Sequence, residues 1–255
     1  MSGSRRRGRG LLGRRRRRHA SSAGRRPGSL PSTGVHRHGP GGNALVVGLH
    51  GYGGDEWQLG SLLPLALPVV RCDLRAPLRV DPGYGWWLPE APAAGRAREL
   101  APTDGVDAAV AEVIERIREA QAAEGIGPHR TALVGYSQGA TLALTVAARR
   151  PELVAAVATG AGALLPGETV AVGNRPLDVL IMNGTLDPVI GAADHAETVR
   201  RFQRAGHRIR SRRDPVPHVI DAAQPPAVSQ FLADVLPVGP AGPAGSGATP
   251  VRPVP

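Results

Sequence analysis

The sequence predicts one α/β domain in which helices cover both faces of a mostly parallel sheet. Short, almost continuously apolar runs alternate with longer amphipathic segments through the middle of the chain, which is the pattern of buried parallel strands joined by surface helices. The two ends differ sharply in composition from this middle part. We therefore expect the domain to span residues 43–238.

Strands are expected at residues 44–49, 69–72, 131–134, 153–158, 179–182 and, in a more polar sequence, 208–212. A first helix should bury one apolar stripe at helical spacing, made by Val106, Val110, Val113, Ile114 and Ile117. Two more helices are expected at residues 138–150 and 193–205, ended by Pro151 and Gly206. Residues 159–178 are too few for a separate cap domain, so we expect a fairly open site.

The net charge of +10 belongs to the N-terminal end of the chain. Residues 1–38 hold twelve arginines and no acidic residue, which leaves 19 basic against 21 acidic residues in the rest. Clustered arginines can bind nucleic acid or an anionic membrane, but the segment lacks aromatic residues that stack on bases. We expect residues 1–42 to be a disordered extension, and the Gly-, Pro- and Ala-rich residues 239–255 to be a disordered tail.

Cys72 is the only cysteine, which excludes an internal disulfide and a thiolate zinc cluster. It lies in a strand-like run, where a buried structural thiol is expected. No apolar signal region of roughly 7 to 15 residues follows the N-terminal arginines, and prolines break the longest apolar stretch, residues 62–70, far below the ~20 residues of a spanning helix. These features favour a soluble protein of the cytoplasm.

The pentapeptide Gly135-Tyr136-Ser137-Gln138-Gly139 stands between an expected strand and an expected helix. In this position G-x-S-x-G makes a turn so tight that its central residue is strained, and side chains in place of the glycines would collide with neighbouring elements. The backbone N–H of Gln138 opens the helix, whose dipole favours an oxyanion. We predict Ser137 as a nucleophile and the Gln138 amide as an oxyanion donor, although chance matches are easy in a glycine-rich chain.

A glycine-rich loop, His50-Gly51-Tyr52-Gly53-Gly54-Asp55, follows the first expected strand. Its glycines would let the backbone approach a substrate carbonyl closely, and the N–H of Tyr52 is the predicted second oxyanion donor. His50 is an alternative catalytic base. We expect it instead to hold the loop by hydrogen bonds, because α/β hydrolases carry their base after the nucleophile in the chain.

Asp187 is the predicted catalytic acid. It lies on a turn, Asn183-Gly184-Thr185-Leu186-Asp187-Pro188, at the carboxyl end of an expected strand, where α/β hydrolases place the acid that orients the base. An ordinary Asp-Pro turn is the structural alternative. Asp178 lies at the other end of that strand, and Asp194 is expected to cap a helix.

His218 is the predicted base, because it follows the last strand at the point where the chain should return over the serine. His207 is the rival. It precedes that strand and should lie at the opposite edge of the sheet. The other histidines are expected to be exposed at helix ends or loops, as for His129 and His195, or to lie in the N-terminal extension, as for His36 and His38.

The chain resembles the phospholipase/carboxylesterase family, the small cap-free α/β hydrolases that include the acyl-protein thioesterases. The matching segments are Leu49-His50-Gly51-Tyr52-Gly53-Gly54-Asp55-Glu56, Leu74-Arg75-Ala76-Pro77 with Gly85-Trp86-Trp87, Gly135-Tyr136-Ser137-Gln138-Gly139-Ala140, and Asn183-Gly184-Thr185-Leu186-Asp187-Pro188-Val189. The resemblance implies the α/β-hydrolase fold, a triad of Ser137, Asp187 and His218, and an oxyanion hole made by the amides of Tyr52 and Gln138.

Two departures from the family pattern stand out. Asn183 replaces the histidine of the family's His-Gly-x-x-Asp stretch, which we expect to be harmless. His218 follows Val216-Pro217 in place of a glycine-rich approach, which we expect to affect how freely that loop moves.

The predicted function is a serine carboxylesterase that hydrolyses short- to medium-chain esters through an acyl-enzyme, with no metal or organic cofactor. Aromatic side chains in loops near the serine are candidates for the acyl pocket: Trp57, Trp86, Trp87 and Tyr136. Of the neighbouring pair Trp86 and Trp87, we expect one to line the pocket and one to pack the loop.

Two alternatives stay open. A thioesterase or lysophospholipase would use the same triad, because the triad does not encode the leaving group. A protein of another class would combine an inert hydrolase-like domain with an arginine-rich tail that binds nucleic acid or a membrane. The sequence does not predict an oligomeric state.

Overall fold

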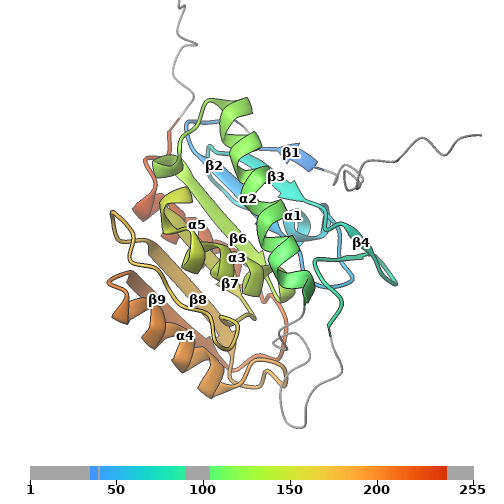
Figure 1. Ribbon diagram of the computed structural model, residues 1–255. Coiled ribbons are helices and arrows are strands. Elements are labelled where there is room, and N and C mark those ends of the chain that lie inside the picture. Colours follow the sequence, from blue (N-terminus) through green and yellow to red (C-terminus); the bar gives the residue numbers. More distant parts are fainter. Residues whose placement is uncertain (1–34, 40, 90–103, 240–255) are drawn as a thin grey trace, which may run out of the picture. The chain divides into compact units, whose positions relative to one another are not determined.

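The computed structural model describes residues 35–39, 41–89 and 104–239, all within one unit of the chain, Pro31–Pro255. Seven strands form the main sheet, in the order β1-β3-β2-β6-β7-β8-β9 (Figure 1). Their bounds are β1 Val35–His38, β2 Leu45–Leu49, β3 Val70–Leu74, β6 Thr131–Tyr136, β7 Ala156–Gly160, β8 Asp178–Gly184 and β9 Arg208–Asp214. All neighbouring pairs are parallel except β1 with β3.

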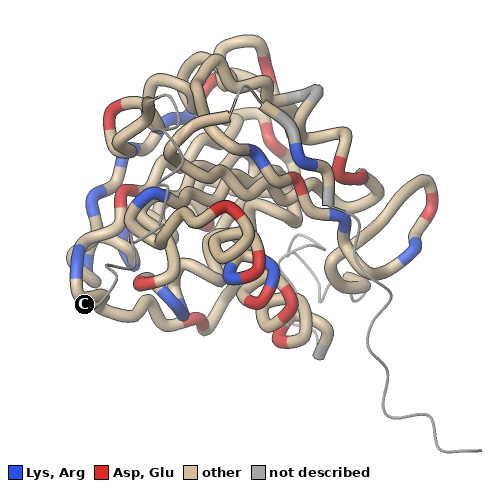
Figure 2. The backbone as a smooth tube through the Cα atoms, turned by 90° about the horizontal axis from the view of Figure 1, so that it is seen from above, with Lys and Arg blue, Asp and Glu red and all other residues tan. Residues whose placement is uncertain are grey.

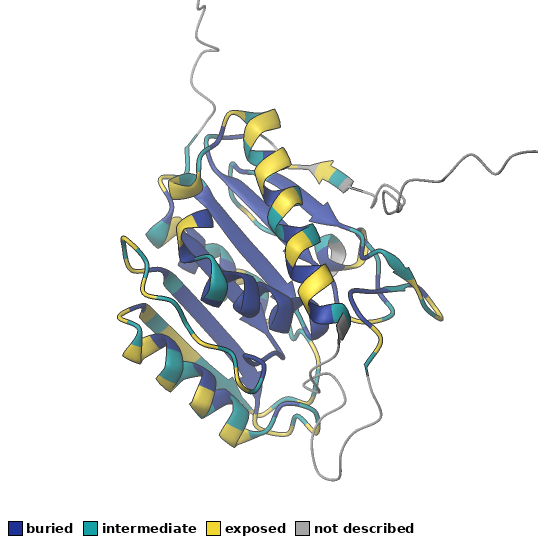
Figure 3. Cartoon of the chain, viewed as in Figure 1, coloured by how far each residue is buried: buried dark blue, intermediate teal, exposed yellow. Residues whose placement is uncertain are grey.

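The central strands are buried because both faces of the sheet are covered. Every residue of β2 and β7 is buried, so an alternating pattern of apolar and polar residues does not arise (Figure 3). Neighbouring residues of one strand enter different cores. Leu133 packs in the cluster on one face and Val134 in the cluster on the other.

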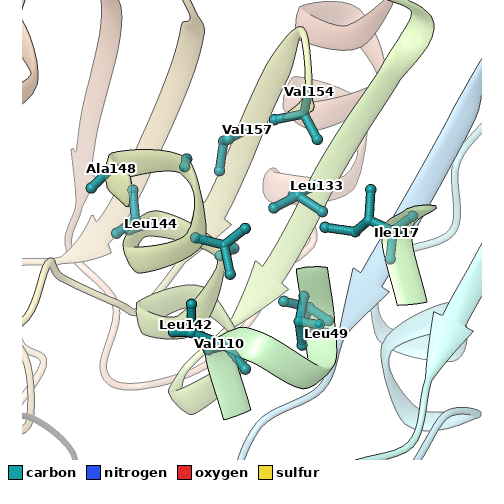
Figure 4. Packing of buried hydrophobic residues seen from close by; sticks show 14 of the residues in the cluster. Leu49, Val110, Ile117, Leu133, Leu142, Leu144, Ala148, Val154 and Val157 are labelled. Atoms are coloured by element: carbon teal, nitrogen blue, oxygen red, sulfur yellow. The ribbon is translucent and has the colours of Figure 1, made fainter. Parts of the chain in front are cut away.

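Helices cover both faces, as the sequence predicts. On one face lie α2 (Asp104–Glu124), α3 (Gln138–Arg149) and α4 (Ala192–Arg204), and Figure 4 shows Val110 and Ile117 of α2 packed with Leu133 and Leu142. On the other face lie α1 (Gln58–Leu62) and α5 (Gln224–Val235). No helix in the described ranges is long and apolar enough to cross a membrane.

The parallel sheet determines where a site can form. The loops after β2, β6, β8 and β9 all leave the sheet at its carboxyl edge, so the predicted catalytic residues of these loops share one edge. A short hairpin of β4 (Leu78–Arg79) and β5 (Tyr84–Gly85) follows β3 and joins the glycine-rich loop, because Gly53 N–H donates to the Tyr84 carbonyl over 2.8 Å.

Some expected boundaries were wrong. We expected residues 1–42 to lie outside the fold, but residues 35–38 form the edge strand β1, which includes His36 and His38. The strand expected at 153–158 begins only at Ala156, because Pro151–Leu153 form a 3-10 turn. Residues 161–177 hold no helix or strand, which agrees with the absence of a cap there. The extension 1–34 and the tail 240–255 lie outside the described residues.

Candidate active site

Ser137 occupies the strained turn that the pentapeptide predicts. Its φ of 53° and ψ of −120° are unusual for a residue with a side chain, and it stands between the end of β6 and the start of α3. Its backbone N–H donates to the Gly160 carbonyl of β7 over 3.0 Å, which ties the turn to the neighbouring strand. The residue is 8% exposed, so it lies at the floor of the site.

The glycines of the turn are required by close contacts. A Cβ on Gly139 would lie 2.1 Å from the Leu49 carbonyl oxygen, and a Cβ on Gly135 would lie 2.5 Å from the Gly139 carbonyl oxygen. A Cβ on Gly51 would lie 3.3 Å from the Ser137 Cβ, so the glycine-rich loop packs directly against the serine. The predicted steric role of the pentapeptide glycines is therefore confirmed.

A row of hydrogen bonds joins the three predicted triad residues. Ser137 Oγ lies 2.8 Å from His218 Nε2, and His218 Nδ1 lies 2.9 Å from Asp187 Oδ2. Because a carboxylate only accepts hydrogen bonds, Nδ1 carries the imidazole proton and Nε2 can accept the serine proton. Asp187 has a fully buried side chain, and its Oδ1 accepts the N–H groups of Val189 and Ile190 over 2.7 and 3.0 Å.

The amides of Tyr52 and Gln138 are in keeping with oxyanion donors. In the described part of the chain neither N–H has a hydrogen-bond partner, although most buried amides do. The Gln138 amide opens α3, and Tyr52 follows the glycine that touches Ser137. Unpaired N–H groups at these two positions are what the stabilisation of a tetrahedral oxyanion would require.

The Gln138 side chain has a role that sequence reasoning missed. Its Oε1 accepts the Trp86 N–H and its Nε2 donates to the Trp87 carbonyl, both over 2.9 Å. Trp86 Nε1 also donates to the His50 carbonyl over 2.9 Å. The two tryptophans are 2% and 0% exposed within the larger core cluster, so both pack, where we expected one to face the pocket.

Tyr136 and Trp57 also have partners that we did not predict. The Tyr136 hydroxyl donates to the backbone carbonyl of His218 over 2.9 Å, and its ring lies 5.7 Å from the His218 ring. Tyr136 thus supports the loop of the predicted base. Trp57 is 57% exposed and its ring contacts that of His36 of β1, with the centroids 3.6 Å apart and the ring planes tilted by 36°.

His50 holds the glycine-rich loop, as we expected. The Ala76 N–H donates to His50 Nε2 over 3.0 Å, so Nδ1 carries the proton and donates to the Gly51 carbonyl over 2.7 Å. Burial lowers the pKa of His50 below its usual value, which keeps the ring neutral.

His207 lies at the start of β9, at the far edge from Ser137, also as expected. Its Nδ1 accepts the Leu177 N–H, and its Nε2 donates to the Ala171 carbonyl. His129 is exposed, as expected. We expected His195 to be exposed as well, and this prediction was wrong. His195 is 5% exposed, because α4 turns this residue toward the sheet, where it contacts Asn183.

The remaining candidates have structural partners. Asp178 pairs with Arg208 at the amino end of β8, and Asp194 Oδ2 accepts the Gly191 N–H at the start of α4, as expected for a helix cap. Cys72 is buried, and burial raises the pKa of its thiol. Within the described residues no group of three or more His, Cys, Asp or Glu side chains is arranged to hold a metal ion.

A family model described as "alpha/beta hydrolase fold" matches residues 44–170. The chain has the α/β-hydrolase fold, as its motifs predict. No curated protein sequence matches it significantly.

Solved structures give the same fold. The chain is similar to esterase PE8, with 25% identity and a TM-score of 0.68 over 80% of this chain and 99% of the other. It is also similar to a phospholipase/carboxylesterase from Dyadobacter fermentans, with 22% identity and a TM-score of 0.65 over 79% and 97%. An acyl-protein thioesterase 2 from Zea mays is similar too, with 19% identity and a TM-score of 0.63 over 78% of this chain and 97% of the other. These neighbours agree with the family that the motifs resemble and with a carboxylic ester hydrolase.

Proposed function

We propose that the chain is a serine carboxylesterase that hydrolyses short- to medium-chain carboxylic esters through an acyl-enzyme on Ser137. The observation that carries this proposal is the row of hydrogen bonds from Asp187 through His218 to Ser137, at 2.9 and 2.8 Å. Both distances are within the range expected of a nucleophile and its general base.

In the proposed acylation step, His218 Nε2 takes the proton of Ser137 Oγ while the oxygen attacks the ester carbonyl. The charge that develops on the carbonyl oxygen would be stabilised by the N–H groups of Tyr52 and Gln138, each contributing about 10²- to 10³-fold in rate. Asp187 would hold the imidazole in the required tautomer and stabilise the imidazolium. The alcohol then leaves with the proton from His218 Nε2.

In the proposed deacylation step, His218 takes a proton from water, and the resulting oxygen nucleophile attacks the acyl carbonyl. The tetrahedral intermediate collapses, the Ser137 oxygen leaves with that proton, and the carboxylic acid is released. The residues at hand account for every proton that moves in this cycle.

Exposed apolar side chains next to the triad are the surface that we propose for the acyl group. Leu186 is 65% exposed and adjoins Asp187, Val219 is 42% exposed and adjoins His218, and Tyr52 is 40% exposed. Such side chains suit an apolar chain of modest length. We did not anticipate Leu186 and Val219 from the sequence, because only the position of the triad gives them this meaning.

The leaving group needs its own test, because an ester and a thioester with one acyl group form the same acyl-enzyme. A matched pair of substrates, nitrophenyl butyrate and a butyryl thioester, separates esterase from thioesterase activity. A lysophospholipid tests for lysophospholipase activity. A kcat/KM for the ester above that for the other substrates supports the proposal. A higher value for the thioester or the lysophospholipid would assign the site to that substrate.

The alternative of another class concerns the arginine-rich segment. Along the described backbone, basic and acidic residues are intermixed (Figure 2), so a binding activity for polyanions would rest on residues 1–34. Steeply salt-dependent retention on DNA that is lost when these residues are removed, in a protein without esterase activity, would favour this alternative.

The direct test compares the wild type with Ser137→Ala on nitrophenyl esters of rising chain length. We expect Ser137→Ala to lower kcat by at least about 10⁴-fold. Ser229→Ala is the matched control, because Ser229 lies on α5 and contacts only Ala66 among the described hydrogen bonds. Equal activity of the wild type and Ser137→Ala would refute the proposal.

A further inference from the structure

A buried hydrogen bond closes the loop that carries Asp187. Asn183 is near the end of β8, and His195 lies in the first turn of α4. Asn183 Nδ2 donates to His195 Nδ1 over 3.0 Å, and the two residues are 2% and 5% exposed. The eleven residues between them, 184–194, include Asp187, so this bond joins the two ends of the acid loop.

Backbone contacts fix the direction of this hydrogen bond. The Gly162 N–H donates to Asn183 Oδ1 and Asn183 Nδ2 donates to the Gly162 carbonyl, both over 3.1 Å, which settles the orientation of the amide. His195 Nδ1 must then be the acceptor and its Nε2 carries the proton, which is donated to Ser211 Oγ over 2.7 Å. Burial first, and Arg213 second, lower the pKa of His195, so the ring is neutral.

Gly162 connects this bond to the nucleophile. A Cβ on Gly162 would lie 2.4 Å from the Ala140 Cβ, in the first turn of α3 that begins at Gln138. The preceding residue, Ala161, has a φ of 55°, which is strained for a side chain. Asn183 therefore holds a strained segment against the helix that opens with a predicted oxyanion donor.

The other end of the network reaches the loop of the base. Ser211 lies on β9, which runs into the segment before His218. The acid loop pairs with that segment, since Thr185 N–H donates to the Asp214 carbonyl over 2.7 Å and Leu186 N–H to the Val216 carbonyl over 3.2 Å. A shift of the acid loop would thus move Asp187 relative to the ring that it orients.

We propose that Asn183 and His195 form a positioning pair, which sets the placement of Asp187 toward His218 without touching the substrate. This inference rests on the proposed function. It predicts an effect on kcat and little effect on KM, because the pair acts on the geometry of the proton transfer and not on the acyl surface.

Three substitutions at one position separate this role from mere folding. His195→Asn places an amide oxygen where Nδ1 accepts from Asn183, His195→Gln places its amide toward Ser211 instead, and His195→Leu makes neither bond. The measurement is kcat for nitrophenyl butyrate per site labelled by a fluorophosphonate, so that misfolded protein is not counted. We expect His195→Leu to lose about 10- to 100-fold in kcat with KM within about 2-fold, and His195→Asn to recover most of that loss.

His207→Leu is the matched control, because His207 is a second buried, neutral histidine with two backbone partners at the far edge of the sheet. It should keep its kcat per labelled site. If His195→Leu does not fold, the comparison of His195→Asn with His195→Gln decides the matter. A kcat for His195→Gln that equals or exceeds that of His195→Asn overturns the proposal. An unchanged kcat in a folded His195→Leu also overturns it. A wild type without esterase activity would instead refute the proposed function.

Discussion

The Tyr136 hydroxyl donates a hydrogen bond to the backbone carbonyl of His218 over 2.9 Å. A residue of the serine turn thus holds the loop of the predicted base, across 82 positions of the chain. Gln138, on the other side of the serine, holds Trp86 and Trp87. Both variable positions of the pentapeptide therefore brace the loops around Ser137.

Tyr136→Phe should lower kcat about 3- to 10-fold with little change in KM, because one hydrogen bond of about 1 kcal/mol no longer fixes the His218 loop. Steady-state kinetics on a nitrophenyl ester measure this. Tyr84→Phe is the control, since it removes a hydroxyl whose described partner is the exposed side chain of Arg79. An equal effect of the two substitutions would contradict this role of Tyr136.

Gln138→Met should destabilise the fold by about 2 to 4 kcal/mol, because it leaves the buried Trp86 N–H and Trp87 carbonyl without partners. Denaturant unfolding measures the change in free energy. Gln230→Met removes an amide from an exposed surface pair with Asp234 and should cost less than about 0.5 kcal/mol. If Gln138→Met lowers the free energy of unfolding by less than about 0.5 kcal/mol, the Gln138 amide does not support the tryptophan segment.

Much of this site could be predicted from the sequence, because the patterns that indicate it lie within short segments of the chain. Apolar runs mark β2, β6 and β8, and the residues that follow each run, around Tyr52, Ser137 and Asp187, lie at one edge of the sheet. The steric need for glycine beside Ser137 was also predictable from the turn alone.

The rest depended on contacts between distant segments. The partners of Tyr136 and Gln138 lie 82 and about 50 positions away, and no local pattern indicates them. We did not predict α5, which has Pro225 and Pro226 in its first turn, a position where proline fits a helix. We missed the buried state of His195 because the polar face of α4 surrounds it in the sequence.

His218 and His207 give a direct test of the base. His218→Ala should lower kcat by at least about 10³-fold. His207→Asn should keep the kcat of the folded enzyme and lose about 1 to 2 kcal/mol of stability, because it gives up the hydrogen bond to Ala171. Full activity in His218→Ala together with a large loss in His207→Asn would transfer the role of base to His207.

Stability should fall as the pH is lowered from about 7.5 to 5.5. Burial lowers the pKa values of His50, His195 and His207, so below about pH 6.5 the unfolded chain binds protons that the native protein does not. Each histidine can then remove about 1 kcal/mol from the free energy of unfolding at pH 5.5. Chemical unfolding at both pH values measures the change.

A matched pair of variants assigns this pH effect. His207→Asn should flatten the pH dependence, since it removes one of the three groups whose pKa burial lowers, whereas Ser229→Ala, which removes no titratable group, should leave it unchanged. A wild-type protein that is equally stable or more stable at the lower pH would show that these rings do not stay neutral in the fold.

The central claim is that His218 and Asp187 make Ser137 the nucleophile, and covalent labelling with a fluorophosphonate tests it most directly. Trypsin should release residues 131–149, a peptide in which Ser137 is the only serine, so mass spectrometry can assign the adduct. We predict one adduct per chain on Ser137, absent from Ser137→Ala and strongly slowed in His218→Ala. Labelling of another residue, or equal labelling of wild type and Ser137→Ala, would contradict the account.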